Sequence, residues 1–163
     1  MKRMMIGVMI VMVVCMTACG GEGRYFGYRE GDFEARIAGS IGGVRFEAEV
    51  RQEGGERSIR YLSPKGLEGV TVCVDETGEA RVLMEEIEGE VDRETVEGLL
   101  EPLMLLTAYE GGVRSVQKSG GDTRVEREDG AELILGADGM PTSVKTERTS
   151  FAILSWESKE QIK

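Results

Sequence analysis

Residues 33–51 read FEARIAGSIGGVRFEAEVR, and this stretch decides the fold class. Apolar residues alternate with polar or small residues on both sides of Gly42-Gly43, and a period of two is typical of a half-buried strand. A Gly-Gly pair between two such runs favours a tight hairpin turn, because glycine adopts positive φ without steric cost. We therefore predict two antiparallel strands, 33–41 and 44–51.

The same pattern continues outward along the chain in both directions. Glycine, with 23 residues, has roughly twice its usual share, and it lies between short apolar alternations. Gly54-Gly55, Gly120-Gly121 and Asp129-Gly130 are further hairpin signals. The other strands we predict are 57–62, 70–74, 80–84, 87–91, 113–118, 123–128, 131–135, 142–148 and 150–157.

Strict alternation assigns the side chains of the last strand to two faces. It places Phe151, Ile153 and Ser155 on one face and Ala152, Leu154 and Trp156 on the other.

The period changes in the middle of the sequence. An apolar stripe with helical spacing predicts a helix over about 92–109. Asp92 suits the N-cap, and Pro102 is expected to kink the helix or to begin a second one. The stripe consists of Val96, Leu99, Leu100, Leu103 and Met104.

These elements predict a mainly β fold of the α+β class. An open antiparallel sheet must cover its apolar face, and the striped helix is the one candidate cover in this sequence. We expect a curved antiparallel sheet of about ten strands that forms an incomplete barrel over the central helical segment.

The N-terminus has the parts of a secretory signal, namely Lys2 and Arg3, an apolar run and a small residue, Ala18. Cys19 follows directly, so the segment resembles the lipobox of bacterial lipoproteins, in which the cysteine after the cleavage site is lipid-modified. We predict a signal peptide over 1–18, a lipidated Cys19 with a flexible tether over 19–31, and a single domain over 32–163.

Two other interpretations of this segment fit less well. A membrane-spanning helix needs roughly 20 apolar residues, and the apolar segment 4–18 is shorter. Cleavage without lipidation prefers a small residue where Met16 stands. The lipobox interpretation predicts an extracytoplasmic protein, anchored to the cell membrane by the lipid on Cys19.

Composition excludes several function classes. Removal of Lys2 and Arg3 with the signal leaves 18 basic and 30 acidic residues, a net charge of −12, which argues against nucleic acid as a partner. The chain has no histidine, which excludes Ser-His and Cys-His nucleophile pairs. Cys73, flanked by Val72 and Val74, is expected to be a small packed side chain.

The strand order and the segment Gly139-Met140-Pro141-Thr142-Ser143-Val144 resemble the lipoprotein-sorting superfamily of LolA, LolB and RseB. The chain also resembles small uncharacterised lipoproteins of Gram-positive bacteria. The superfamily resemblance covers most of 32–156. It implies a curved sheet over helices with an apolar cavity that accepts acyl chains. No catalytic or ligand-contact motif of the superfamily is matched residue by residue.

We therefore expect a non-enzymatic binding module for a lipid or another apolar group between sheet and helix, with no cofactor and no metal. The alternative is a structural or interaction protein of the envelope, with a filled core and a protein partner. An enzyme would need convergent carboxylates in a cleft, and the dense acidic residues single out no such pair. The candidate ligand-lining residues are Phe33, Phe46, Leu99, Leu103, Met104 and Trp156.

Overall fold

A computed structural model describes residues 25–84, 87–108 and 111–159. Its strands match the predicted ones to within a few residues at each end. The predicted signal peptide, Cys19 and the first part of the tether lie outside the described residues. The elements are η2 (Gly27–Arg29), β1 (Asp32–Ile41), β2 (Val44–Glu53), β3 (Glu56–Ser63), β4 (Thr71–Val74), β5 (Ala80–Met84), β6 (Ile87–Val91), α2 (Arg93–Thr107), β7 (Val113–Ser119), β8 (Asp122–Arg127), β9 (Glu132–Leu135), β10 (Pro141–Lys145) and β11 (Thr149–Lys159).

All eleven described strands form one antiparallel sheet in the order β6-β5-β4-β3-β2-β1-β11-β10-β9-β8-β7. The first six strands run outward from β1 to one edge, and the last five return from the opposite edge to pair β11 with β1. The sheet does not close into a barrel, because β6 and β7 remain at its two edges. The prediction of a mainly β fold with an incomplete barrel is confirmed.

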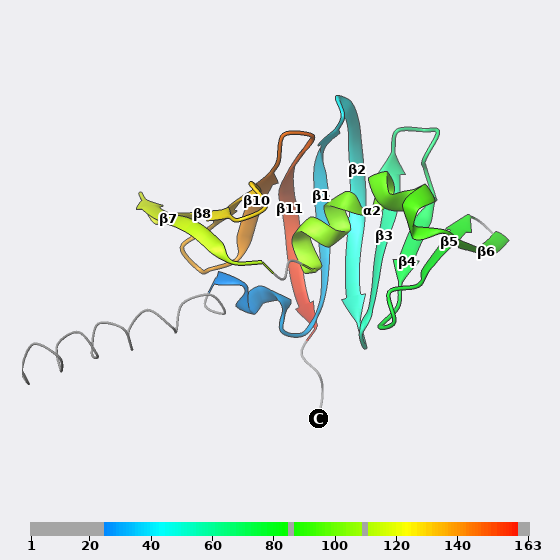
Figure 1. Ribbon diagram of the computed structural model, residues 1–163, viewed down its shortest axis with the longest axis horizontal. Helices are drawn as coiled ribbons and strands as arrows, with labels where there is room; N and C mark the ends of the chain where they lie inside the picture. Colours follow the sequence, from blue (N-terminus) through cyan, green and yellow to red (C-terminus); the bar gives the residue numbers. More distant parts are fainter. Residues whose placement is uncertain (1–24, 85–86, 109–110, 160–163) are drawn as a thin grey trace, which may run out of the picture.

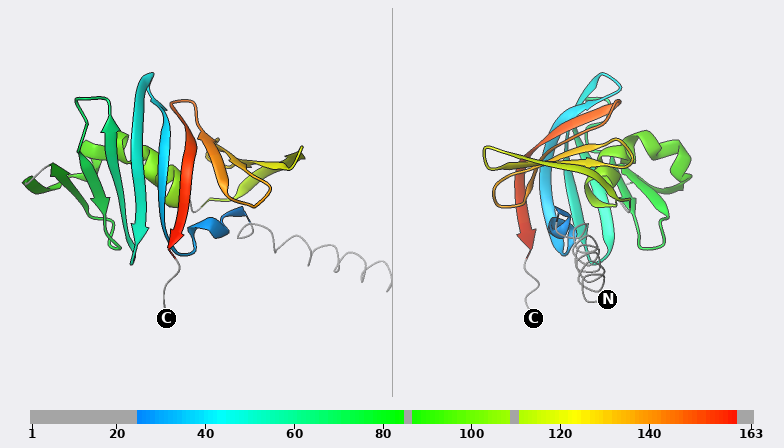
Figure 2. Two further views of the ribbon diagram at one scale, coloured as in Figure 1. Left: turned by 180° about the vertical axis from the view of Figure 1, so that it is seen from behind. Right: turned by 60° about the vertical axis from the view of Figure 1, so that its left-hand side comes forward.

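The helix α2 covers one face of this sheet. Figure 1 shows α2 in front of the central strands, and Figure 2 shows the same strands from behind with the helix on their far side. The sheet is strongly twisted, so that the β7–β8 hairpin crosses the direction of β1 and β11 in the right-hand view of Figure 2. We call the face that carries α2 the inner face. It bears the buried side chains Phe33, Ala35 and Ile37 of β1.

A β-bulge in β11 corrects the faces predicted for the last strand. Arg36 pairs with Ser155 and Ile37 pairs with Ile153, so Leu154 is skipped in the pairing with β1. The extra residue reverses the alternation beyond it. Trp156 therefore pairs with the buried Ala35 and lies on the inner face, the same face as Phe151. Strict alternation would have placed Trp156 and Phe151 on different faces of the sheet.

The centre of the sheet depends on a close approach of β1 and β11 at Gly39. A Cβ atom at Gly39 would lie 2.0 Å from the carbonyl oxygen of Ser150 and 2.5 Å from the Cα atom of Phe151. Phe46 of β2 is the partner of Gly39 on the other side. Glycine thus makes room for two phenylalanine side chains where the two halves of the sheet meet.

The helix begins as predicted and differs from its prediction at Pro102 and at its C-terminal end. Asp92 takes the predicted N-cap position, although its side chain makes no capping hydrogen bond. Pro102 lies within one continuous helix, and the cap residue at the end is Ala108. Among the described residues, no helix is long and apolar enough to cross a membrane. Cys73 is buried in β4, as expected for a small packed side chain.

Candidate functional site

The candidate site is the interface between α2 and the inner face of the sheet. The helix turns a row of side chains toward the sheet in which Leu100, Leu103 and Leu106 are at most 1% exposed. This row contains Val96, Leu100 and Leu103 of the predicted stripe, together with Leu106. Leu99 and Met104 lie at its margin, where they are partly buried against the core.

The six candidate lining residues fall into three groups. Phe33 and Trp156 stack at one end of the inner face, with 4.1 Å between ring centroids. Phe46 lies near the other end, beside the rings of Tyr61 and Phe151. Phe46 pairs with Gly39, so it is separated from Phe33 by the length of β1 between positions 33 and 39, about 20 Å of strand. Leu99, Leu103 and Met104 belong to α2, which lies over this strip.

The middle of α2 is bound to β3 through a buried tyrosine. The Tyr61 hydroxyl donates a hydrogen bond of 2.7 Å to the main-chain carbonyl of Leu99. Pro102 has no N–H, so the carbonyl of Gly98 loses its usual donor within the helix, and the turn that contains Leu99 is a weak point. Burial raises the pKa of Tyr61, so its hydroxyl remains a donor at any physiological pH.

Two arginines hold the C-terminal end of the helix. Arg127 of β8 donates from Nη1 to the carbonyl oxygen of Leu105 at 2.9 Å, and Arg29 of η2 donates from Nε to that of Leu106 at 3.0 Å. The last carbonyls of a helix carry partial negative charge and need donors from outside it. The last turn of α2 has no basic residue of its own, so distant arginines supply both donors and charge.

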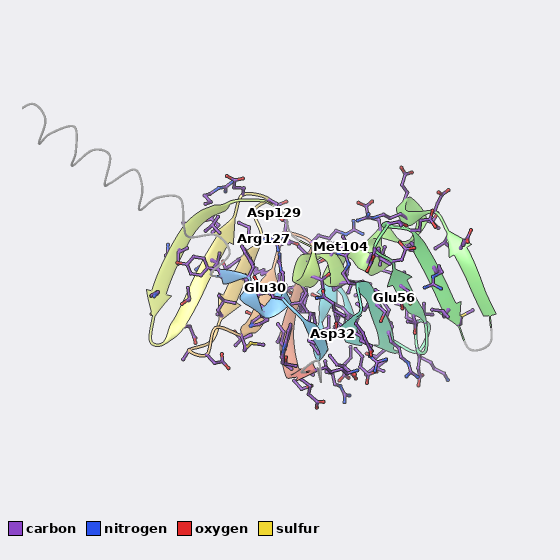
Figure 3. All side chains as sticks on the ribbon, turned by 90° about the horizontal axis from the view of Figure 1, so that it is seen from below. Glu30, Asp32, Glu56, Met104, Arg127 and Asp129 are labelled. Carbon is purple, nitrogen blue, oxygen red and sulfur yellow. The ribbon has the colours of Figure 1, made fainter. Side chains whose placement is uncertain are left out.

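Arg127 is 2% exposed, and its charge is compensated by Asp129. The two side chains approach to 2.5 Å between Nη2 and Oδ2. Burial by itself would raise the pKa of Asp129, but hydrogen bonds from Arg127 and from the Ala131 N–H, with the arginine charge, outweigh it and lower the pKa. Figure 3 shows Arg127 and Asp129 beside each other, on the side of the sheet where Met104 lies.

Arg29 comes from a segment that sequence analysis assigns to the flexible tether. Residues 25–31 instead pack against the core, with Tyr25, Phe26 and Tyr28 partly buried. The Tyr28 ring meets the Trp156 ring edge-on at 5.6 Å. We call residues 25–31 the N-terminal strap. It lies near the end of β11, below α2 in the view of Figure 1.

An open hollow of about 680 Å³ runs along the outer side of α2. Its lining is mainly charged, and Met104 is the one candidate lining residue that borders it. Its charged residues are Arg93, Glu94, Glu97, Glu101, Arg127, Asp129 and Arg148. The candidate residues Phe33, Phe46 and Leu103 are buried in the core instead, so the apolar interface is closed and filled by side chains.

The acidic residues outside this interface pair with arginines across strands or stabilise turns. Within the described ranges, no three His, Cys, Asp or Glu side chains are placed to hold a metal ion. The Asp75 carboxylate accepts hydrogen bonds from Thr77 and from the Glu79 N–H, and the Thr77 side chain contributes most to the lowering of its pKa. Asp75 thus stabilises the turn before β5.

Comparison with solved structures finds similar folds at low sequence identity. An uncharacterized conserved protein from Thermus thermophilus aligns with 85% of this chain and 85% of its own, at TM-score 0.54 and 12% identity. MucB aligns with 83% of this chain and 56% of its own, at TM-score 0.51 and 14% identity. The LolA superfamily protein NE2245 from Nitrosomonas europaea gives TM-score 0.49 and 7% identity, over 84% of this chain and 93% of its own. No protein-family model and no curated protein matches the sequence.

Sequence reasoning missed the two arginines and the strap that carries one of them. A signal for them existed, because a predicted helix without a basic residue near its C-terminus requires donors from elsewhere. Which arginines would supply them depended on the fold, since Arg29 and Arg127 lie far from the helix end in sequence.

Proposed function

We propose that this protein is a non-enzymatic module of the cell envelope, held at the membrane by lipid on Cys19, that binds an apolar group between α2 and the inner face. The observation that carries the proposal is how α2 is attached. Three side chains, Tyr61, Arg127 and Arg29, donate hydrogen bonds to its main-chain carbonyls across an apolar strip about 20 Å long. When the helix moves away from the sheet, water can replace each of these donors at the helix carbonyls and each of these carbonyls at the donors.

The magnitudes make such a movement feasible. Each of the three hydrogen bonds contributes about 0.5–1.5 kcal/mol net, or somewhat more where the donor is charged. Burial of an acyl chain contributes about 0.8 kcal/mol per CH₂ group, so a chain of about a dozen groups offsets the loss. Leu100, Leu103 and Leu106 would then contact the ligand rather than the sheet, and their side chains would stay out of water.

The N-terminus and the fold support this assignment. The lipobox-like sequence before Cys19 fits a protein that acts outside the cytoplasm, and MucB, which is similar in fold, has been solved in complex with MucA(peri). An open sheet with one helix over its inner face is the arrangement in which an apolar ligand can replace helix contacts without loss of the sheet.

Titration with a fluorescent polyene fatty acid tests the proposal. The emission of this probe rises on transfer to an apolar site, and added palmitate should displace the probe and lower the emission. Leu103→Ala enlarges the helix–sheet interface and should tighten binding several-fold. Leu133→Ala removes an equally buried leucine from β9 and is the matched control. No saturable binding to the folded chain, or equal effects of the two variants, would contradict the proposal.

A second candidate function rests on a different observation. The interface is filled, and no strand within the described residues pairs with the outer side of β6 or β7. An open edge can accept an extended segment of a protein partner. Because the similar fold of MucB occurs in a complex with another protein, a partner protein is the alternative if the fatty acid does not bind.

A further inference from the structure

The N-terminal strap closes one end of the helix–sheet interface. We propose that the acyl chain of a membrane phospholipid enters at this end, between Tyr28 and Trp156, by displacing the strap. This inference rests on the proposed function and adds the source of the ligand and its route.

The strap is attached in a way that permits displacement. None of residues 25–31 is fully buried, whereas Phe33, which follows them in the sequence, is fully buried. Tyr28 contacts Trp156 edge-on, and Trp156 in turn stacks on Phe33. Removal of the strap would therefore expose two stacked aromatic rings at the end of the apolar strip. An acyl chain is a suitable substitute for the lost ring contacts, because both are apolar.

Arg29 connects the strap with the helix. Its guanidinium lies over the Phe26 ring at 4.5 Å and the Tyr28 ring at 5.4 Å, and its Nε donates to the Leu106 carbonyl. Gln52 of β2 donates to the main-chain carbonyls of Arg29 and Gly31 from the other side. Displacement of the strap thus removes a donor from the end of α2, so opening of the route and loosening of the helix are coupled.

The position of the strap in the sequence points to the membrane as the source. Tyr25 follows Cys19 by six residues, a distance that an extended chain spans in about 20 Å at most. Lipid on Cys19 therefore keeps this end of the interface close to the bilayer surface.

Trp156, the single tryptophan, reports directly on this route. The full lipidated chain is placed in phosphatidylcholine vesicles whose acyl chains carry bromine, a short-range quencher of tryptophan emission. We expect Arg29→Ala to raise quenching about twofold over wild type. Gln52→Ala, which releases the strap from the sheet side, should raise it too. Arg60→Ala, at an exposed position of β3, is the matched control and should equal wild type.

A second reporter separates a route into the interface from mere closeness to the vesicle. Trp156→Phe combined with Leu154→Trp moves the indole to an exposed position on the same strand. Arg29→Ala should leave the quenching of this reporter unchanged. An equal rise at both reporters, or no rise at Trp156 in a chain that still binds the polyene fatty acid, would overturn the inference. Failure of every variant to bind the fatty acid would overturn the proposed function itself.

Discussion

The indole of Trp156 stacks on the ring of Phe33, with 4.1 Å between centroids and 20° between ring planes. The two residues lie at opposite ends of the domain sequence, yet their strands β1 and β11 are neighbours in the centre of the sheet. The contact exists because the bulge at Leu154 turns Trp156 to the inner face. It joins the two halves of the sheet at the end where the N-terminal strap packs.

The bulge predicts an unusual contrast at Leu154. Deletion of this exposed residue removes the extra position and leaves Trp156 opposite Ala35, so the tryptophan should stay on the inner face and its emission should not shift. Deletion of the exposed Ala152, which lies in the regular part of the ladder, should instead turn one flank of β11 to the wrong face and cost about 3–5 kcal/mol of unfolding free energy. Urea denaturation followed by tryptophan emission measures both deletions. Similar losses for the two deletions would mean that Leu154 is not the extra residue of the bulge.

Gly39 predicts a steric effect of a single methyl group. Gly39→Ala should destabilise the fold by about 1–3 kcal/mol, because the new Cβ would overlap the backbone of Ser150 and Phe151. Gly89→Ala in β6 is the control, since a Cβ at that position meets no atom within 4 Å. Thermal unfolding compares the two variants, and equal melting temperatures would contradict the close approach of β1 and β11.

The Tyr61 hydroxyl predicts a modest and specific contribution. Tyr61→Phe should lower the unfolding free energy by about 0.5–1.5 kcal/mol, because the Leu99 carbonyl loses a buried donor. The loss should be accompanied by faster amide hydrogen exchange in the turn of α2 around Pro102. Tyr25→Phe at a partly buried site serves as the control. An unchanged exchange rate in α2 would show that this bond does not hold the helix.

Asp129 predicts a loss of stability in acid. Its pKa is lower in the folded chain than in the unfolded chain, so its contribution is present above the unfolded value of about 3.9 and is lost as pH falls through the folded value. Asp129→Asn should therefore be less stable than wild type at pH 7, and the difference should shrink below about pH 4. Asp122→Asn, at an exposed end of β8, is the control. A difference independent of pH would contradict the ion pair with Arg127.

Local signals in the sequence were sufficient for most of the fold. Glycine pairs such as Gly42-Gly43 mark the hairpins, and they adopt the positive φ that the turns require. Each hairpin pairs neighbours in sequence, so its register follows from the turn. The bulge at Leu154 could not be predicted in this way, because it depends on the pairing of β11 with the distant β1.

The candidate site was predictable only in its apolar part. The helical stripe indicated which helix residues face the sheet, and Leu100 and Leu103 do so. The polar attachments of the helix join residues distant in sequence, as Arg29 and Leu106 illustrate. Periodicity carries no information on such pairs. Glycines in and before the strap suggest a flexible tether, whereas its aromatic residues find partners only in the folded sheet.

Native mass spectrometry of residues 20–163, which lack the predicted lipidation site Cys19 and can be purified from a bacterial host without detergent, asks whether the fold carries a bound lipid. We expect a reproducible added mass that disappears on organic extraction and is identified as a lipid, and a larger bound fraction for Arg29→Ala than for Arg60→Ala. A bare protein mass in wild type and in both variants would contradict it, and would direct attention to a protein partner at the open edges β6 and β7.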